Sequence, residues 1–480
     1  MRSARRYITS GTAIERVAAG LMVLTLLVGC DNPTPPAPTP INQAPGITPT
    51  GTVSSTLPNS SPTPKPPAPT ATSVAAWAPT INWRGSNWYL LGVNYPYYHY
   101  GNDFGGNVWG SYGVHDPSTY KEVNADFAKM SSLGVRTVRW FVFADGRAGI
   151  TFDAAGLPTG IDEFVFQDFD AALEIAERHN IALNFVLLDF RFLWDAGLEN
   201  GAQLGGHASV LATPEGQQAL VRNIFEPIFR RYAHHPSILS WEVMNEPEWA
   251  ILDAGHVDRQ AISQPLTLAT FRAFAKLTVD AIHTVAGTYA TLGCADVKWA
   301  RNWVGLGLDY YQIHYYDWMK PYSTDNLFAM RAESLRLDRP VVVGEFPAGL
   351  SSVANLRDYL DTWYANGYAG AWPWSFRGDA TVGSPDATVF GAWADVHQPV
   401  VDIPPAPTAT VDALTYKVLG GDSLSEIAER FDTTAEAIME ANSLSSTVIR
   451  PGQVLIIPVG SGSNIEETPQ RVPSRTPTAP

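Results

Sequence analysis

Two glutamates follow apolar segments of the chain and are suited to acid–base and nucleophilic chemistry. Glu246 lies in the sequence Asn245-Glu246-Pro247 after an apolar run, and Glu345 follows a second run that ends at Gly344. Hydrolysis of a glycosidic bond with retained configuration needs two carboxyl groups facing the sugar: one holds a proton for the leaving oxygen, and the other stays ionised to attack the anomeric carbon. We therefore treat these glutamates as a candidate catalytic pair.

Apolar runs that alternate with amphipathic helical stretches must position this pair. The runs lack polar alternation, which is typical of strands buried on both faces. They are Tyr89–Asn94, Thr137–Phe143, Ala182–Asp189, Ile238–Val243, Tyr289–Cys294, Tyr310–His314, Pro340–Gly344 and Ala369–Trp374. This pattern predicts an α/β fold, an eightfold β/α (TIM) barrel, whose catalytic groups lie at the carboxyl ends of the strands. Only Ala295 to Asp309 separates the fifth and sixth runs, so the helix between them must be short.

A doubly wound open sheet is the alternative architecture for the same pattern. Such folds commonly carry a Gly-rich phosphate-binding loop after the first strand. The sequence after Asn94 has no such loop. The pattern therefore favours the barrel.

The block from 76 to 402 resembles glycoside hydrolase family 5, the cellulase and mannanase family. Asn245-Glu246-Pro247 is similar to its acid/base motif, and Gly344-Glu345-Phe346 is similar to its nucleophile strand. The resemblance implies that Glu246 donates the proton and Glu345 attacks. It also implies that Asn245 holds the sugar 2-hydroxyl. The substrate class implied is a β-1,4-glucan or a β-mannan, cleaved through a covalent glycosyl-enzyme.

Four further positions match the same family pattern and are expected to bind substrate or orient the glutamates. Arg139 corresponds to a strand-two arginine beside the nucleophile, where its charge would keep Glu345 ionised. His314 and Tyr316 correspond to a strand-six pair, of which the tyrosine orients the nucleophile. Trp374 corresponds to the tryptophan that floors the cleavage subsite, with Trp372 as the alternative register.

One position departs from the family pattern. The family usually places a histidine after strand three, whereas this chain reads Leu188-Asp189-Phe190-Arg191-Phe192. Asp189 or Arg191 is the candidate substitute, and substrate placement in that subsite is open at this stage. For the catalytic pair itself we expect a carboxyl separation of about 5 Å, the retaining geometry. We also expect the negative charge of Glu345 to raise the pKa of Glu246 until the glycosyl-enzyme forms.

The first thirty residues resemble an export signal of a bacterial lipoprotein. Arginines at positions 2, 5 and 6 precede an apolar run that is too short to span a membrane. The run ends in Leu27-Val28-Gly29-Cys30, which resembles a lipobox, and this implies a lipid on Cys30. The expected localisation is therefore the outer face of a bacterial membrane. An ordinary signal peptide that happens to contain a cysteine is the alternative.

Differences in composition along the 480 residues indicate where one segment ends and the next begins. Stretches rich in Pro, Thr and Ser cannot bury enough apolar surface to fold and indicate tethers. The expected segments are a signal peptide at 1–30, a linker at 31–75, the barrel at 76–402, a hinge at 403–413, a small module at 414–459 and a disordered tail at 460–480.

The small module resembles a LysM domain, a βααβ unit that binds glycans containing N-acetylglucosamine. The resemblance is carried by Tyr416-Lys417-Val418, Gly421-Asp422-Ser423-Leu424 and 451–458. A helix capped by Asp422 or Ser423 would place Leu424, Ile427, Ala428 and Phe431 on one face. The implied partner is peptidoglycan or a chitin-like polymer.

Charge and motifs exclude several other classes of function. The net charge of −15 argues against a nucleic-acid partner. The sequence has no His-Glu-x-x-His motif or cysteine cluster, and the expected chemistry needs no metal or other cofactor. Three alternatives to the hydrolase stay open: a transglycosylase on the same barrel, a non-catalytic envelope protein that binds glycan, and a barrel that cuts cell-wall glycan.

Overall fold

The structure is a computed structural model of the whole chain. It describes residues 80–253, 256–317, 326–378, 382–405, 415–418, 422–431 and 433–458. The expected signal peptide with Cys30, the linker at 31–75 and the tail at 460–480 lie outside these residues, as does most of the expected hinge. Among the described residues, none of the helices combines the length and apolar character needed to cross a membrane.

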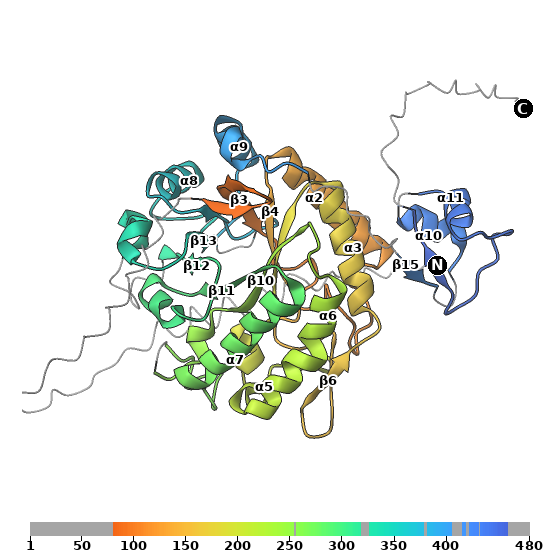
Figure 1. Ribbon diagram of the computed structural model, residues 1–480, viewed down its shortest axis with the longest axis horizontal. Coiled ribbons are helices and arrows are strands. Elements are labelled where there is room, and N and C mark those ends of the chain that lie inside the picture. Colours follow the sequence, from red (N-terminus) through yellow and green to blue (C-terminus); the bar gives the residue numbers. More distant parts are fainter. Residues whose placement is uncertain are drawn as a thin grey trace, which may run out of the picture. The chain divides into compact units, whose positions relative to one another are not determined.

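Parallel strands close into a barrel, which confirms the predicted fold class (Figure 1). Around the barrel the order is β10-β11-β12-β13-β14-β3-β4-β7. The strands are β3 (Leu90–Asn94), β4 (Thr137–Phe141), β7 (Ala182–Val186), β10 (Ile238–Asn245), β11 (Tyr289–Cys294), β12 (Tyr311–His314), β13 (Val341–Glu345) and β14 (Gly370–Ala371). Each lies within or overlaps one of the eight apolar runs, because a strand covered on both faces must be apolar throughout.

Helices surround the barrel (Figure 1), and their apolar residues are buried. In α3 (Val165–Arg178), the spacing of Phe169, Ala172, Leu173 and Ala176 places them on one face, and all four are buried. The others are α2 (Pro117–Ser132), α4 (Ala208–Ala212), α5 (Pro214–Leu220), α6 (Glu226–Arg231), α7 (Leu268–Ala281), α8 (Leu356–Ala365) and α9 (Ala387–Val401). Two π-helical turns, η2 (Val221–Phe225) and η4 (Ile282–Ala286), continue α5 and α7.

The short connection between the fifth and sixth strands contains the 3-10 helix η5 (Val297–Trp303). Asp296 caps it by accepting a hydrogen bond from the Lys298 amide at 3.0 Å. This confirms that the connection has room only for a short helix. The other 3-10 helices are η1 (Phe190–Leu193), η3 (Pro247–Ala250), η7 (Leu327–Ala329) and η8 (Ala332–Leu335).

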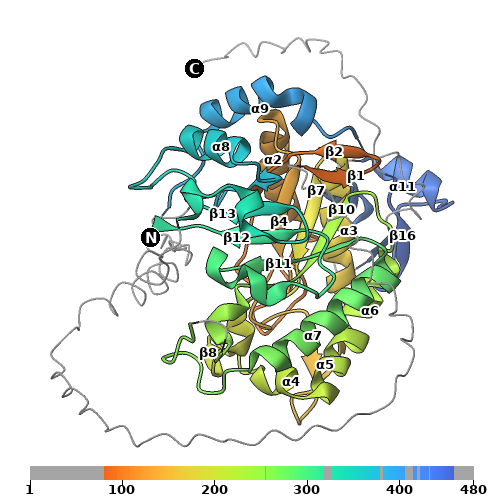
Figure 2. The same ribbon diagram turned by 60° about the vertical axis from the view of Figure 1, so that its left-hand side comes forward.

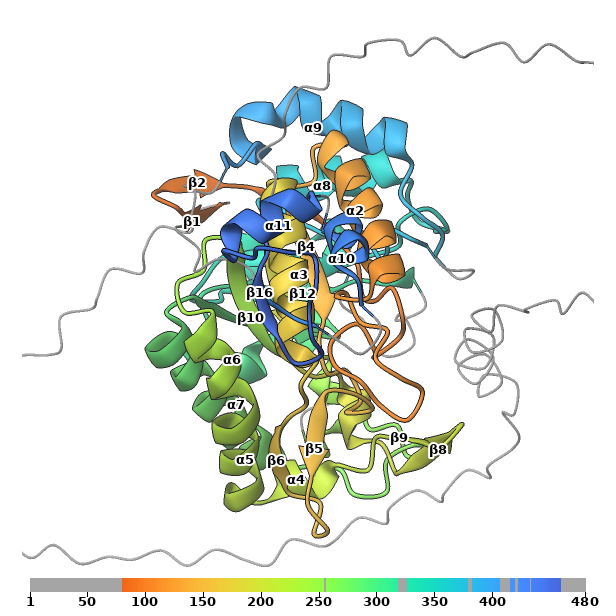
Figure 3. The same ribbon diagram turned by 90° about the vertical axis from the view of Figure 1, so that its right-hand side faces the viewer.

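Short hairpins mark the two ends of the barrel (Figures 2 and 3). The hairpin β1 (Ile81–Trp83) and β2 (Ser86–Trp88) lies at the amino ends of the strands, where the Tyr289 hydroxyl donates to the Asn82 carbonyl. The hairpin of β8 (Gly197–Glu199) and β9 (Ala202–Leu204) lies toward the opposite end (Figure 3). A third hairpin pairs β5 (Ile150–Phe152) with β6 (Pro158–Ile161). The amino end of the barrel is thus covered, and the carboxyl ends of the strands face the longer loops.

The C-terminal module has the predicted βααβ order. Its strands β15 (Thr415–Lys417) and β16 (Val454–Ile456) pair antiparallel, and α10 (Leu424–Arg430) and α11 (Ala435–Ala441) lie between them in sequence. Ser423, the second of the two predicted caps, accepts from the Glu426 amide, and the Glu426 carboxylate accepts from the Ser423 amide. This capping box starts the helix whose predicted apolar face is buried.

Candidate active site

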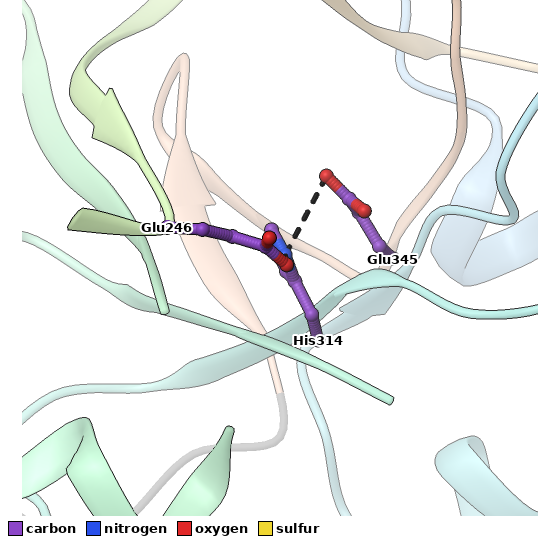
Figure 4. Close-up of side chains that lie close together, drawn as sticks. All are labelled: Glu246, His314 and Glu345. Atoms are coloured by element: carbon purple, nitrogen blue, oxygen red, sulfur yellow. Dashed lines mark hydrogen bonds and ion pairs between the residues drawn. The ribbon is translucent and has the colours of Figure 1, made fainter. Parts of the chain in front are cut away.

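The two predicted glutamates meet at the carboxyl ends of their strands (Figure 4). Glu345 is the last residue of β13, and Glu246 directly follows β10. One oxygen of each carboxyl group and one ring nitrogen of His314 lie within 4.8 Å of one another. Such close carboxyl groups fit the retaining geometry, because an inverting pair must stand further apart to admit a water molecule.

Glu246 owes its position to an unusual backbone conformation. Its φ and ψ angles of 47° and 48° are left-handed, a region that a residue with a Cβ atom seldom adopts. The turn separates β10 from η3, and Pro247 begins that helix. Backbone strain of this kind costs on the order of 1–3 kcal/mol and is found most often at functional sites.

Arg139 on β4 connects the two glutamate strands through all five of its N–H groups. Nε and Nη2 donate to Glu242 at 2.8 and 2.6 Å, and Nη1 donates to Glu345 at 2.5 Å. The remaining two donate to Asn94 at 3.0 Å and to Asn245 at 2.7 Å. The guanidinium is fully buried, so its planar donor set fixes the positions of four side chains at once.

Glu345 has the environment of a nucleophile that must be ionised. Burial raises the pKa of Glu345 and the nearby Glu246 carboxyl adds to the rise, while the charge of Arg139 opposes it. The Tyr316 hydroxyl also donates to its Oε2 at 2.8 Å and stabilises the carboxylate. The structure thus places Arg139 and Tyr316 beside the glutamate they were expected to contact.

Glu246 has the environment of a proton donor. Burial raises its pKa to about 7, and a hydrogen bond from Trp249 Nε1 to Oε2, 2.8 Å long, partly opposes the rise. We expected the charge of Glu345 to raise this pKa, but burial is the largest cause, and the negative charge that adds to the rise is that of Glu242. A carboxyl group that titrates near 7 still holds its proton in mildly acidic solution.

His314 lies between the two carboxyl groups (Figure 4). Its Nδ1 lies 2.7 Å from Glu246 Oε1 and 3.5 Å from Glu345 Oε1. Burial lowers the pKa of His314 to about 4, so the ring is neutral near pH 7 and its close contact with Glu246 is a hydrogen bond. Glu246, His314 and Glu345 also have the spacing of metal ligands. The Arg139 charge beside Glu345 disfavours a second cation there.

Two tryptophans near strand eight differ in exposure, and this decides between the two registers. Trp372 is fully buried and donates its Nε1–H to the Leu90 carbonyl at 3.0 Å inside the barrel. Trp374 is partly exposed and meets the Phe141 ring edge-on at 6.0 Å. Its backbone pairs with Pro347, two residues after Glu345. Trp374 is therefore the ring that can face a sugar.

Asp189, one of the two candidate substitutes for the missing histidine, contacts the candidate site. Its Oδ2 accepts from Asn245 Nδ2 at 2.8 Å. Arg191 donates to the Tyr100 hydroxyl at 2.5 Å, and its Nε lies 3.9 Å from Asp189 Oδ1. Of the two candidate substitutes, Asp189 is thus the one that touches Asn245.

The sequence reasoning missed the residues beneath the carboxyl pair. Glu242 is fully buried and accepts from Asn184 and Gln312 at 2.8 Å each, as well as from Arg139. Asn94 donates to the Gly344 and Trp372 carbonyls at 2.8 and 2.9 Å. A charged residue inside an otherwise apolar strand run was the available signal for Glu242.

Comparisons with known proteins agree with this geometry. Residues 416–458 match the LysM domain family. The chain is 26% identical over 332 residues to a mannan endo-1,4-beta-mannosidase of Mytilus edulis, an alignment of 62% of this chain and 85% of that protein. It is 25% identical over 336 residues to one of Cryptopygus antarcticus, with 61% and 83% covered.

Solved structures show the same barrel. The crystal structure of endo-1,4-beta-mannanase from Eisenia fetida matches with a TM-score of 0.57 and 22% identity, covering 67% of this chain and 96% of that one. Beta-1,4-mannanase from Aplysia kurodai matches with a TM-score of 0.56 and 22% identity, covering 68% and 97%. The chain therefore carries a glycoside hydrolase barrel that is similar to those of mannan endo-1,4-beta-mannosidases, followed by a LysM domain.

Proposed function

We propose that the protein is an endo-acting β-1,4-mannanase. The observation that carries the proposal is the meeting of Glu246 and Glu345 within 4.8 Å at the carboxyl end of a closed barrel. Relatives named as mannan endo-1,4-beta-mannosidases align with most of this barrel and supply the substrate class. The relatives favour mannan over the β-1,4-glucan that the sequence left open.

The environments of Glu345 and Glu246 assign each glutamate its step in the reaction. Glu345 attacks the anomeric carbon while Glu246 gives its proton to the leaving oxygen, and a glycosyl ester forms on Glu345. Esterification removes the negative charge of Glu345, so the pKa of Glu246 falls. Glu246 then takes a proton from a water molecule that attacks the ester and releases the sugar with its configuration retained.

Purified protein offered mannan, β-1,4-glucan, xylan and chitosan tests the substrate. We expect mannan to be cleaved fastest, with solution viscosity falling well before many reducing ends appear, as endo action requires. Proton NMR of the first product should show the β-anomer. Turnover of mannan by Glu345→Ala at the wild-type rate would contradict the proposal, and transfer to an added manno-oligosaccharide acceptor would identify a transglycosylase.

We further propose that the protein is exported and anchored by a lipid on Cys30, and that its LysM domain binds glycans containing N-acetylglucosamine. The sequence Leu27-Val28-Gly29-Cys30 supports the anchor, and the match over 416–458 supports a glycan-binding role. Expression of the full chain and of Cys30→Ser in a bacterium, with labelled palmitate, tests the anchor. Label in the Cys30→Ser variant, or none in the wild type, would contradict it.

Binding of the full chain to insoluble peptidoglycan or chitin tests the LysM part of the proposal. The Glu345→Ala variant removes turnover and leaves the LysM domain unchanged. We expect a pull-down that soluble N-acetylglucosamine oligomers displace and that soluble manno-oligosaccharides do not. Displacement by manno-oligosaccharides alone would assign the binding to the barrel instead.

A further inference from the structure

Asp189 and Asn245 continue the pairing of β7 and β10 beyond the end of β7, at the last residue of β10. The Asn245 amide donates to the Leu188 carbonyl at 2.8 Å, and Asp189 and Asn245 form an isolated parallel bridge. Both side chains are largely buried, with 4% and 5% of their surface exposed. The backbone therefore holds the two side chains next to each other at the rim of the site.

The amide group of Asn245 lies between two partners that can each play only one role. Its Oδ1 accepts from Arg139 Nη2 at 2.7 Å, and its Nδ2 donates to Asp189 Oδ2 at 2.8 Å. A guanidinium can only donate and a carboxylate can only accept, so a flipped amide would lose both bonds. Asp189 is itself held, because its Oδ1 accepts from the Arg191 amide at 2.9 Å.

One hydrogen of the Asn245 amide group is left for a ligand. The Nδ2 atom carries two hydrogens, and Asp189 accepts one of them. Within the described part of the chain, no recorded hydrogen bond uses the other. This hydrogen belongs to the residue that the family resemblance places against the 2-hydroxyl of the sugar being cleaved.

We propose that Asp189 is a positioning residue that fixes the Asn245 amide so that its second N–H donates to the sugar 2-hydroxyl. The inference rests on the proposed function and adds the residue that acts where the family histidine is absent. A contact with the 2-hydroxyl strengthens as the oxocarbenium-like transition state forms. Loss of the orientation should therefore lower kcat and leave KM nearly unchanged.

A double-mutant cycle on the full-length protein tests this role. With an aryl β-mannobioside, we expect Asp189→Ala to lower kcat about tenfold or more with KM changed by less than about twofold. In the Asn245→Ala background the same substitution should cost no further kcat, because the group that it orients is gone. Independent, multiplicative losses would overturn the proposal, as would a loss confined to KM.

A substrate analogue makes the test specific for the hydroxyl. The analogue is an aryl mannobioside whose cleaved sugar lacks the 2-hydroxyl. On this analogue, Asp189→Ala and the wild type should have nearly equal activity. An equal kcat loss on both substrates would assign Asp189 a general structural role and overturn the proposal. Asp195→Ala is the matched control, because Asp195 lies in the same loop and bonds Ser263 instead of Asn245.

A conservative variant, Asp189→Asn, keeps the size of the side chain and one acceptor oxygen. It should therefore restore part of the kcat that Asp189→Ala loses. It also replaces the alanine variant if circular dichroism shows that Asp189→Ala does not fold. The cycle compares variants on whichever β-glycan the wild type cleaves. Failure to cleave mannan would therefore contradict the proposed function, whereas multiplicative losses on an accepted glycan would contradict only the role of Asp189.

Discussion

The Arg139 guanidinium and the Glu242 carboxylate form a two-point ion pair inside the barrel, with N–O distances of 2.8 and 2.6 Å. Both side chains are fully buried. The pair lies beneath the candidate active site, because the same guanidinium also contacts Glu345 and Asn245. A buried pair of this kind is costly to break, since removal of one partner leaves the other charge uncompensated.

Glu242→Gln should therefore reduce both stability and activity. The glutamine amide would place a donor against an Arg139 donor and remove a negative charge from a dry site. We expect the free energy of unfolding in guanidinium chloride to fall by about 3–5 kcal/mol. We also expect kcat/KM to fall by about tenfold or more, because Arg139 orients the nucleophile.

The control for this prediction is a pair near the surface. Asp402 binds Arg136 at 2.8 Å with 40% of its side chain exposed. Asp402→Asn should cost no more than about 1 kcal/mol and should leave kcat/KM unchanged. Equal stability losses in the two variants would show that the buried Arg139–Glu242 pair contributes no more to stability than the surface pair does.

Much of this site was predictable because its residues follow recognisable strands. Glu246 and Glu345 stand where apolar runs end, and barrel geometry brings such positions to one face. Arg139, His314 and Tyr316 were found through family motifs, and the structure places each beside a glutamate. The positions of these residues around the barrel were thus predictable from the spacing of the apolar runs and from the family motifs.

Three features were not predictable, for physical reasons. Glu242 is part of an apolar run, and only the closed barrel shows that Arg139 faces it. The dominance of burial in raising the pKa of Glu246 depends on which segments surround its carboxyl group, and strand patterns do not report this. The choice of Asp189 over Arg191 depends on a side-chain direction at a strand end, and local sequence does not fix it.

Trp249→Phe should move the basic limb of the pH–activity profile to higher pH. Glu246 must be protonated to act as the acid, so kcat/KM falls as pH rises through its pKa of about 7. Trp249 donates to the carboxylate and thereby stabilises the ionised form. Its loss raises the pKa of Glu246 further, by about one unit for one hydrogen bond to a charged group.

The matched control is Trp299→Phe. Trp299 meets the Trp249 ring edge-on at 5.7 Å, so its replacement tests the packing of the same aromatic pair. The basic limb should stay in place in this variant. A shift to lower pH in Trp249→Phe, or equal shifts in both variants, would refute the assignment of Glu246 as the acid.

Tyr316→Phe should move the acidic limb of the same profile to higher pH. Glu345 must be ionised to attack, so activity rises as pH increases through its pKa. The Tyr316 hydroxyl stabilises the carboxylate, and its removal raises the pKa of Glu345. Tyr311→Phe, on the preceding strand β12, is the control, because that hydroxyl bonds Asp338. An unchanged acidic limb in Tyr316→Phe would contradict the prediction.

Gly92→Ala should destabilise the barrel, because strand β3 has no room for a methyl group there. A Cβ atom at Gly92 would lie 2.5 Å from the Thr137 carbonyl oxygen and 2.6 Å from Trp372 Cδ1. The first atom is backbone of the neighbouring strand, so a side-chain rotation cannot relieve the clash. We expect the free energy of unfolding to fall by about 2–3 kcal/mol. Gly160→Ala is the control, since a Cβ atom at Gly160 would lie 3.6 Å from its nearest neighbour, Thr151 Oγ1. Unfolding curves that coincide for the two variants would show that the barrel tolerates a methyl group at Gly92.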